Sequence, residues 1–159
     1  MPPEQRPDVL LTSPFVRAQQ TTACVADALG IARSDIRVDE RLREKEFGIL
    51  DRYTKAGIIA RFPELAEQRA LVGKFYFRPP GGETPRETGA RAVAVLAQAT
   101  SDAVIVTHKG VMRALLALAT GWDMVGKPPI RFPAEGHALL MEWREGVLYL
   151  QPDTVDMRN

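Results

Sequence analysis

The stretch AVIVTHKGVMRALLALATG, residues 103–121, decides the fold of this chain of 159 residues. It opens on a short run of apolar, mostly β-branched residues, which is typical of a buried strand in a parallel sheet. Residues 111–120 predict a helix that ends at Gly121, because glycine readily adopts the left-handed conformation found at helix C-termini. The turn between them holds His108, Lys109 and Gly110. The pattern predicts a strand–turn–helix unit with a histidine just past the strand.

A second unit of the same kind lies at VLLTSPFVRAQQTTACVADALG, residues 9–30. Residues 9–11 predict a buried strand, and residues 15–29 carry apolar side chains at helical spacing up to Gly30. Ser13 is a favourable N-cap and Pro14 suits the first helical position. Arg17 then falls in the opening turn of the helix.

The other segments predict two further helices, a loop and a terminal hairpin. Residues 55–61 read as a helix capped by Thr54 and stopped by Pro63. A helix over residues 84–98 begins with a capping box and a proline at its first position. Residues 75–82 predict a loop, and residues 138–143 and 147–150 predict a hairpin. The order predicts one domain over residues 1–159, an α/β protein built as a three-layer α/β/α sandwich with a mostly parallel sheet and an antiparallel edge hairpin.

Composition excludes several classes of function. Lys plus Arg number 21 against 20 Asp plus Glu, so the net charge of +1 predicts neither a nucleic-acid nor a membrane partner. No apolar run is long enough for a membrane span, and the N-terminus does not resemble a signal peptide. The lone Cys24 lies in an apolar helical pattern and predicts a small core residue in a reducing, cytoplasmic location. No clustered side chains have metal-ligand spacing, so neither a metal nor a cofactor is predicted.

Two residues point to an anion site. Arg17 and His108 both follow a predicted parallel strand and lie where a helix begins. Ligands of open α/β sheets gather at the carboxyl ends of the strands, and helix N-termini there favour anions. The pattern predicts a phosphate or carboxylate site. On the residues alone, the alternative stays open that Arg17 is solvated and His108 is a hydrogen-bonded core residue.

Three motifs resemble those of the histidine phosphatase (phosphoglycerate-mutase-like) superfamily. They are TSPFVRAQQT at residues 12–21, LREKEFG at 42–48 and VTHKGVMR at 106–113, with RPPGGE at 78–83 similar to a loop of bacterial members. They cover most of the chain in the family's order. The resemblance implies that Arg17 binds phosphoryl oxygens, that His108 neutralises charge developing on the phosphoryl group, and that Glu44, rather than Glu46, protonates the leaving oxygen.

The sequence departs from the family at two places. The family's nucleophilic histidine lies in an Arg-His-Gly motif at the end of its first strand, and this sequence contains neither that motif nor that strand. The other histidine, His137, matches no nucleophile motif, and Met1 is interpreted as an internal methionine of a longer protein. Lys109 stands where glycine is common, either as a further cation at the site or as a solvated residue.

Two functions follow from the resemblance. The first is a phosphomonoester phosphatase that works through a phosphohistidine and is inactive as this chain. The second is a catalytically dead module that binds phosphate or regulates a partner. In either case a small phosphorylated substrate or phosphate is the expected ligand, and a homodimer is possible because the sheet is shortened. Arg78 is a candidate for substrate specificity together with Lys109, while the aromatic residues 75–77 equally fit a packing role.

Overall fold

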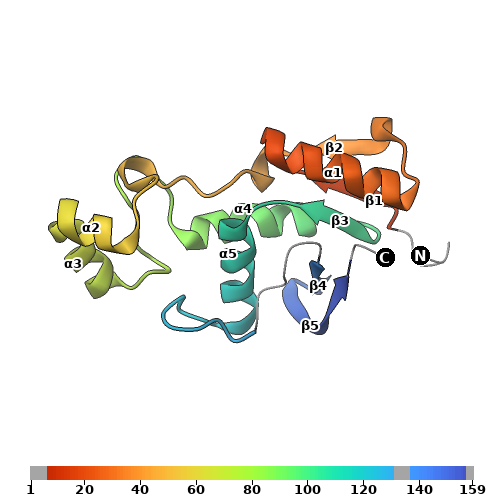
Figure 1. Cartoon of the computed structure of the whole chain (residues 1–159). Helices are drawn as coiled ribbons and strands as arrows, with labels where there is room; N and C mark the ends of the chain where they lie inside the picture. Colours follow the sequence, from red (N-terminus) through yellow and green to blue (C-terminus); the bar gives the residue numbers. More distant parts are fainter. Residues whose placement is uncertain (1–6, 131–136, 157–159) are drawn as a thin grey trace.

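The computed structural model describes residues 7–130 and 137–156. Its main sheet has three parallel strands, with β1 (Val9–Thr12) between β2 (Ile36–Val38) and β3 (Ala103–Val106) (Figure 1). Thr12, the last residue of β1, is in register with Val106, the last residue of β3. Because the two strands are parallel and end together, the segments that follow them leave the sheet side by side.

Helices cover both faces of this sheet (Figure 1). On one face lies α1 (Val16–Leu29), whose Thr22 hydroxyl donates to the Thr12 hydroxyl at 2.7 Å. On the other lie α4 (Pro85–Leu96) and α5 (Lys109–Thr120), which pack on each other. The predicted three-layer α/β/α arrangement is confirmed.

The C-terminal segment forms the predicted hairpin, of strands β4 (His137–Arg144) and β5 (Val147–Asp156). Within the described ranges these strands pair only with each other, so the hairpin is a separate antiparallel sheet rather than an edge of the parallel one. It joins the domain through side chains instead, because Leu148 packs into a buried cluster with Ala92 of α4 and Val111 and Leu115 of α5.

A smaller helical unit lies at the other end of the molecule (Figure 1). It comprises α2 (Lys55–Arg61) and α3 (Pro63–Val72), and a second core of Leu50, Ile58 and Phe77 lies beneath it. The prediction for α2 is confirmed, including its cap by Thr54. Helix α3 was not predicted. Pro63 marks the end of α2 in the sequence pattern, but it also occupies the first position of a new helix. Short 3₁₀ turns form at Arg33–Asp35, Glu40–Leu42 and Gly48–Leu50.

Two predicted helix starts are wrong. Ser13 does not cap α1, whose N-cap is Phe15 and has no side-chain cap. The hydroxyl of Ser13 pairs with His108 and accepts a hydrogen bond of 3.3 Å from the backbone N–H of Phe15. Of the predicted turn at residues 108–110, Lys109 and Gly110 are helical, since α5 begins at Lys109 with His108 as its N-cap. The left-handed ends at Gly30 and Gly121 are confirmed.

Two other predictions concern exposure and the N-terminus. Cys24 is exposed, not a core residue, because the buried stripe of α1 runs through Ala18, Thr22, Ala26 and Leu29. Met1 and the segment before His137 lie outside the described residues. No helix in the described part of the chain is both long and apolar enough to cross a membrane.

Candidate active site

The structure brings Arg17 and His108 into contact. Arg17 Nη2 lies 3.0 Å from His108 Nδ1, although 91 positions separate the residues in the sequence. On the other side of the ring, Ser13 Oγ lies 2.7 Å from His108 Nε2. The Phe15 ring meets the imidazole edge-on with centroids 5.0 Å apart. The imidazole is buried while the Arg17 side chain reaches solvent.

These contacts fix where the proton of His108 lies. A guanidinium only donates hydrogen bonds, so Nδ1 of His108 must accept from Arg17. The neutral ring then carries its proton on Nε2 and donates to Ser13 Oγ. Burial lowers the pKa of His108 below its usual 6.5, and the positive charges of Arg17 and Arg91 lower it further, against the opposing effect of Glu44. The imidazole is therefore mainly neutral at pH 7.

Glu44 reaches the same place from a loop. It follows the 3₁₀ turn Glu40–Leu42, and its Oε1 accepts a hydrogen bond of 2.8 Å from the backbone N–H of Lys45. Its carboxylate lies against Gly110 in the first turn of α5, so closely that a methyl group on Gly110 would overlap Oε1. The negative charge of Glu44 acts on His108 and tends to raise its pKa, so the carboxylate lies near the imidazole. Arg17 and Glu44 are thus both neighbours of His108.

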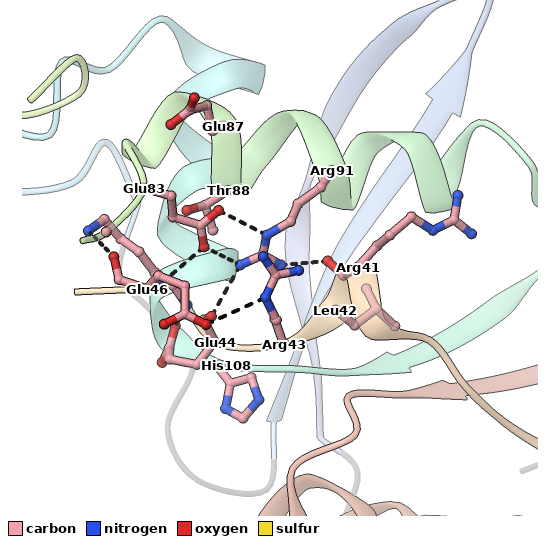
Figure 2. A network of polar contacts seen from close by, with 12 residues as sticks. Arg41, Leu42, Arg43, Glu44, Glu46, Glu83, Glu87, Thr88, Arg91 and His108 are labelled. Atoms are coloured by element: carbon pink, nitrogen blue, oxygen red, sulfur yellow. Dashed lines mark hydrogen bonds and ion pairs between the residues drawn. The ribbon is translucent and has the colours of Figure 1, made fainter. Parts of the chain in front are cut away.

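A buried ion pair holds the Glu44 loop from behind (Figure 2). Arg91 on α4 pairs with Glu83 at 2.6 Å, and the two side chains are only 13% and 12% exposed. The same guanidinium donates to the backbone oxygens of Arg41 at 2.6 Å and Glu44 at 3.2 Å. One guanidinium thereby binds the loop backbone at two points, at Arg41 and at Glu44 itself.

Three further hydrogen bonds tie this loop to the rest of the domain. Glu83 accepts from the backbone N–H of Glu46 at 3.0 Å, and its own N–H donates to the oxygen of Glu46 at 3.0 Å. Thr107, just past β3, donates to the oxygen of Leu42 at 2.7 Å. The sequence did not predict a role for Arg91 or Glu83. Helical spacing could have indicated that Arg91 is turned inward, because it lies on the face of α4 that also carries Thr88 and Val95.

Other candidates lie apart from this centre. Arg78 is exposed, forms an ion pair with Glu87 and donates to the oxygen of Gly82 at 3.3 Å. Glu46 is exposed and faces Arg43, with 3.6 Å between the charged atoms. Lys109 is exposed but lines a cavity next to Glu44. Within residues 7–130 and 137–156, no group of three His, Cys, Asp or Glu side chains is placed to hold a metal ion.

In sequence, the chain is similar to phosphoglycerate mutases. A 2,3-bisphosphoglycerate-dependent phosphoglycerate mutase from Methylobacterium radiotolerans is 31% identical over 131 residues, which cover 78% of this chain and 61% of the mutase. The mutase of the same name from Sinorhizobium fredii is 39% identical over 85 residues, covering 53% of this chain and 39% of its own. The chain therefore matches less than two thirds of the length of these relatives.

A solved structure and a family profile extend the match. Mycobacterial glucosyl-3-phosphoglycerate phosphatase in complex with inorganic phosphate aligns at a TM-score of 0.67 and 25% identity, over 93% of this chain and 77% of that one. The profile of the histidine phosphatase superfamily (branch 1) matches residues 3–150. Since that match covers nearly the whole sequence, the chain belongs to the histidine phosphatase superfamily.

Proposed function

We propose that this protein is the phosphate-binding part of a phosphomonoester phosphatase that works through a phosphohistidine. The observation that carries the proposal is the 3.0 Å contact between Arg17 and His108 at the carboxyl ends of two adjacent parallel strands. A guanidinium can donate two parallel hydrogen bonds to a phosphoryl group, and a protonated imidazole can donate a third. The N-terminus of α5 adds a partial positive charge beside them.

The chemistry has two steps, and Glu44 serves both. First, a histidine nitrogen forms a bond to phosphorus, the bond to the ester oxygen breaks, and the Glu44 carboxyl gives its proton to that oxygen. Second, a water oxygen bonds to the phosphorus of the phosphohistidine, the phosphorus–nitrogen bond breaks and frees the histidine, the Glu44 carboxylate accepts a proton from the water, and inorganic phosphate leaves. General acid–base catalysis of this kind contributes about 10²–10⁴-fold in rate. The position of Glu44 beside His108 supports this role.

The nucleophile is the part that this sequence does not provide. It contains two histidines and no Arg-His-Gly motif. His108 has Ser13 and Arg17 as partners at its two nitrogen atoms, which supports binding rather than nucleophilic attack. We propose that the chain alone does not turn over a substrate and that a histidine in an Arg-His-Gly segment completes the site.

The same absence favours a second candidate function. A module that keeps Arg17 and His108 but has no nucleophile would bind a phosphorylated small molecule without hydrolysing it. The two candidate functions predict different results when an Arg-His-Gly segment is added to the chain: the first predicts hydrolysis, and the second predicts binding without hydrolysis.

The test compares the chain alone with the chain fused to an Arg-His-Gly strand of a relative. Hydrolysis of p-nitrophenyl phosphate and calorimetric binding of inorganic phosphate are measured for both. We expect phosphate binding by both, and turnover only by the fusion. R17A should lower the turnover by at least about 100-fold because bidentate contacts to the phosphoryl group are lost. R33A removes an exposed arginine paired with Asp27 and serves as the control.

The outcomes separate the candidates. Binding without turnover in the fusion would favour the binding module. Turnover by the chain alone would contradict the proposed nucleophile, and the absence of phosphate binding in both proteins would contradict the proposal itself.

A further inference from the structure

Ser13 is the buried partner of the His108 imidazole. Its side chain is fully buried just past β1, and its Oγ lies 2.7 Å from His108 Nε2. Its backbone N–H donates to the oxygen of Val106, the last residue of β3, at 3.0 Å. The hydroxyl is therefore held by the two strands that lead to the site, and it keeps a fixed position next to the ring.

The two nitrogen atoms of the imidazole have different surroundings. Nε2 faces the buried Ser13, whereas Nδ1 faces Arg17, whose side chain reaches solvent. Phe15 contacts both charged groups of the pair: its ring meets the imidazole edge-on, and its centre lies 4.8 Å from the Arg17 Cζ atom. An anion that Arg17 binds would therefore meet the ring at Nδ1 and not at Nε2.

The contact with Arg17 limits what Nδ1 can bind. While a guanidinium donates to it, Nδ1 carries no proton. The oxygen atoms of a phosphoryl dianion are acceptors as well, so an unprotonated Nδ1 cannot form a hydrogen bond with them. Binding of the anion at His108 thus requires a proton on Nδ1, which comes either from solvent or from Nε2 through a change of tautomer.

The contacts of Ser13 favour a proton from solvent. Its Oγ accepts from Nε2 and, at 3.3 Å, from the backbone N–H of Phe15, so both acceptor positions of the hydroxyl are used. A change of tautomer would break the hydrogen bond from Nε2 and require the hydroxyl to turn and donate instead. An added proton on Nδ1 leaves both hydrogen bonds to Ser13 in place.

Charged groups on three other segments act on the ring. Glu44 stabilises the imidazolium, while Arg17 on α1 and Arg91 on α4 oppose it. Lys109 follows the histidine in its own helix. Burial and the two arginines lower the pKa of His108, whereas a bound dianion would raise it, because the negative charge offsets the arginines and stabilises the imidazolium.

We propose that Ser13 is a positioning residue that keeps Nε2 of His108 protonated and Nδ1 turned toward the phosphoryl group, so that binding of a phosphoryl dianion takes up one proton from solvent at Nδ1. This inference rests on the proposed function, because Arg17 and His108 must bind the phosphoryl group. It adds a protonation step to that binding. Affinity then falls as the pH rises, by up to about tenfold for each pH unit between the pKa values of the free and the bound ring.

The test uses sulfate, a tetrahedral dianion that, unlike inorganic phosphate, does not itself take up protons near pH 7. Calorimetric titration of the chain at pH 7 in buffers of different ionisation enthalpy counts the protons taken up. We expect more than about half a proton per bound sulfate, and an affinity about three- to tenfold lower at pH 8 than at pH 7. Lys45 and Lys74, with pKa values of about 8, are already mostly protonated at pH 7 and contribute little.

Nitrogen NMR assigns the proton to the ring. The chain contains two histidines, so H137Q leaves only the signals of His108. We expect the neutral tautomer with its proton on Nε2 before sulfate is added, and the imidazolium afterwards. A neutral ring with its proton on Nδ1 in the complex would show a change of tautomer and overturn the inference.

Variants test the part of Ser13. S13A removes the acceptor of Nε2, and should lower sulfate affinity at pH 7 about tenfold, because a hydrogen bond from a charged ring is stronger than one from a neutral ring. It should also at least halve the proton uptake, since the tautomer with its proton on Nδ1 no longer loses a hydrogen bond. T22V removes another fully buried hydroxyl, which donates to Thr12 and Ala18, and should change neither value.

The outcomes separate this inference from the proposed function. Sulfate binding without proton uptake would overturn the inference and leave the proposed function standing. Proton uptake that S13A leaves unchanged, or that T22V lowers as much as S13A does, would also overturn it. If the unaltered chain bound neither sulfate nor inorganic phosphate, both would fall.

Discussion

The candidate acid Glu44 lies where it does because residue 110 has no side chain. The carboxylate occupies the space that a Cβ atom on Gly110 would take. Gly110 has an ordinary helical backbone, so its importance lies in close approach rather than in conformation. At the same scale, the Ser13 hydroxyl pairs with the imidazole of His108 and is not the N-cap of α1, while the donor-only guanidinium of Arg17 fixes the tautomer of the histidine. Single atoms at these positions decide the geometry of the site.

The chain fused to an Arg-His-Gly strand is called the restored enzyme here. In it, G110A should displace the Glu44 carboxylate and lower the turnover of alkyl phosphates at least about tenfold, because a small displacement of a catalytic group greatly reduces the rate. The loss should be much smaller with p-nitrophenyl phosphate, whose leaving group departs without a proton. Rates for both substrates are the measurement. G57A lies in α2, where a methyl group meets only ordinary contacts, and is the control. An equal loss on both substrates would contradict the role given to Glu44.

Among the elements, α4 and the segment at residues 78–83 act together as a support for the loop at residues 41–46. Arg91 and Glu83 reach this loop from the two elements and bind its backbone, as Figure 2 shows. The backbones also approach closely. Gly48 has a φ of 56°, and a side chain there would overlap the oxygen of Pro80. The loop therefore holds its shape through contacts with other elements.

R91M should lower the free energy of unfolding by about 2–4 kcal/mol, because it leaves Glu83 buried without its charged partner. R78M breaks a solvent-exposed arginine–glutamate pair and should cost less than about 1 kcal/mol. Urea unfolding of both variants makes the comparison. If the two losses were equal, the Arg91–Glu83 pair would not be a special support.

The same pair should also affect catalysis through Glu44. In the restored enzyme, E83Q keeps an oxygen to accept from Glu46 but weakens the grip on Arg91, and should lower turnover of alkyl phosphates more than that of p-nitrophenyl phosphate. A purely structural role would lower both rates alike.

At the scale of the whole molecule, two partly buried lysines lower the free energy of unfolding at neutral pH. Lys45 and Lys74 line the cavity beside Glu44, where both are partly buried, whereas both are solvated in the unfolded chain. Their pKa values of about 8 in the folded state lie below the ordinary 10.5. The partly buried position of these two lysines therefore lowers the stability of the folded protein at neutral pH.

Stability should rise as the pH increases from about 8 to 10.5. In this range the unfolded state binds more protons than the folded state, so the free energy of unfolding grows with pH. Allowing for partial exposure, we expect roughly 1 kcal/mol for each lysine. Urea unfolding at pH 7.5 and 10 gives the measurement. K74M should be more stable than the unaltered chain at pH 7.5 and lose part of the rise, while a rise undiminished in K74M would contradict the explanation.

Local rules in the sequence determined much of this protein. The apolar runs predicted β1 and β3, the capping box predicted the start of α4, and glycines predicted where α1 and α5 end. The same rules missed β2, which is only three residues long, and α3. Turn and cap signals act within a few residues, so they place elements along the chain and Arg17 in a first helical turn.

Only the tertiary structure decided which groups meet. The contact of Arg17 with His108 spans 91 positions and that of Arg91 with the oxygen of Glu44 spans 47. The first depends on β1 and β3 being neighbours in register, and the second on α4 packing beside the loop at residues 41–46. The cavity beside Glu44 is likewise formed by several segments of the chain. Periodicity records which face of an element is buried, but distances between elements depend on how the whole chain packs.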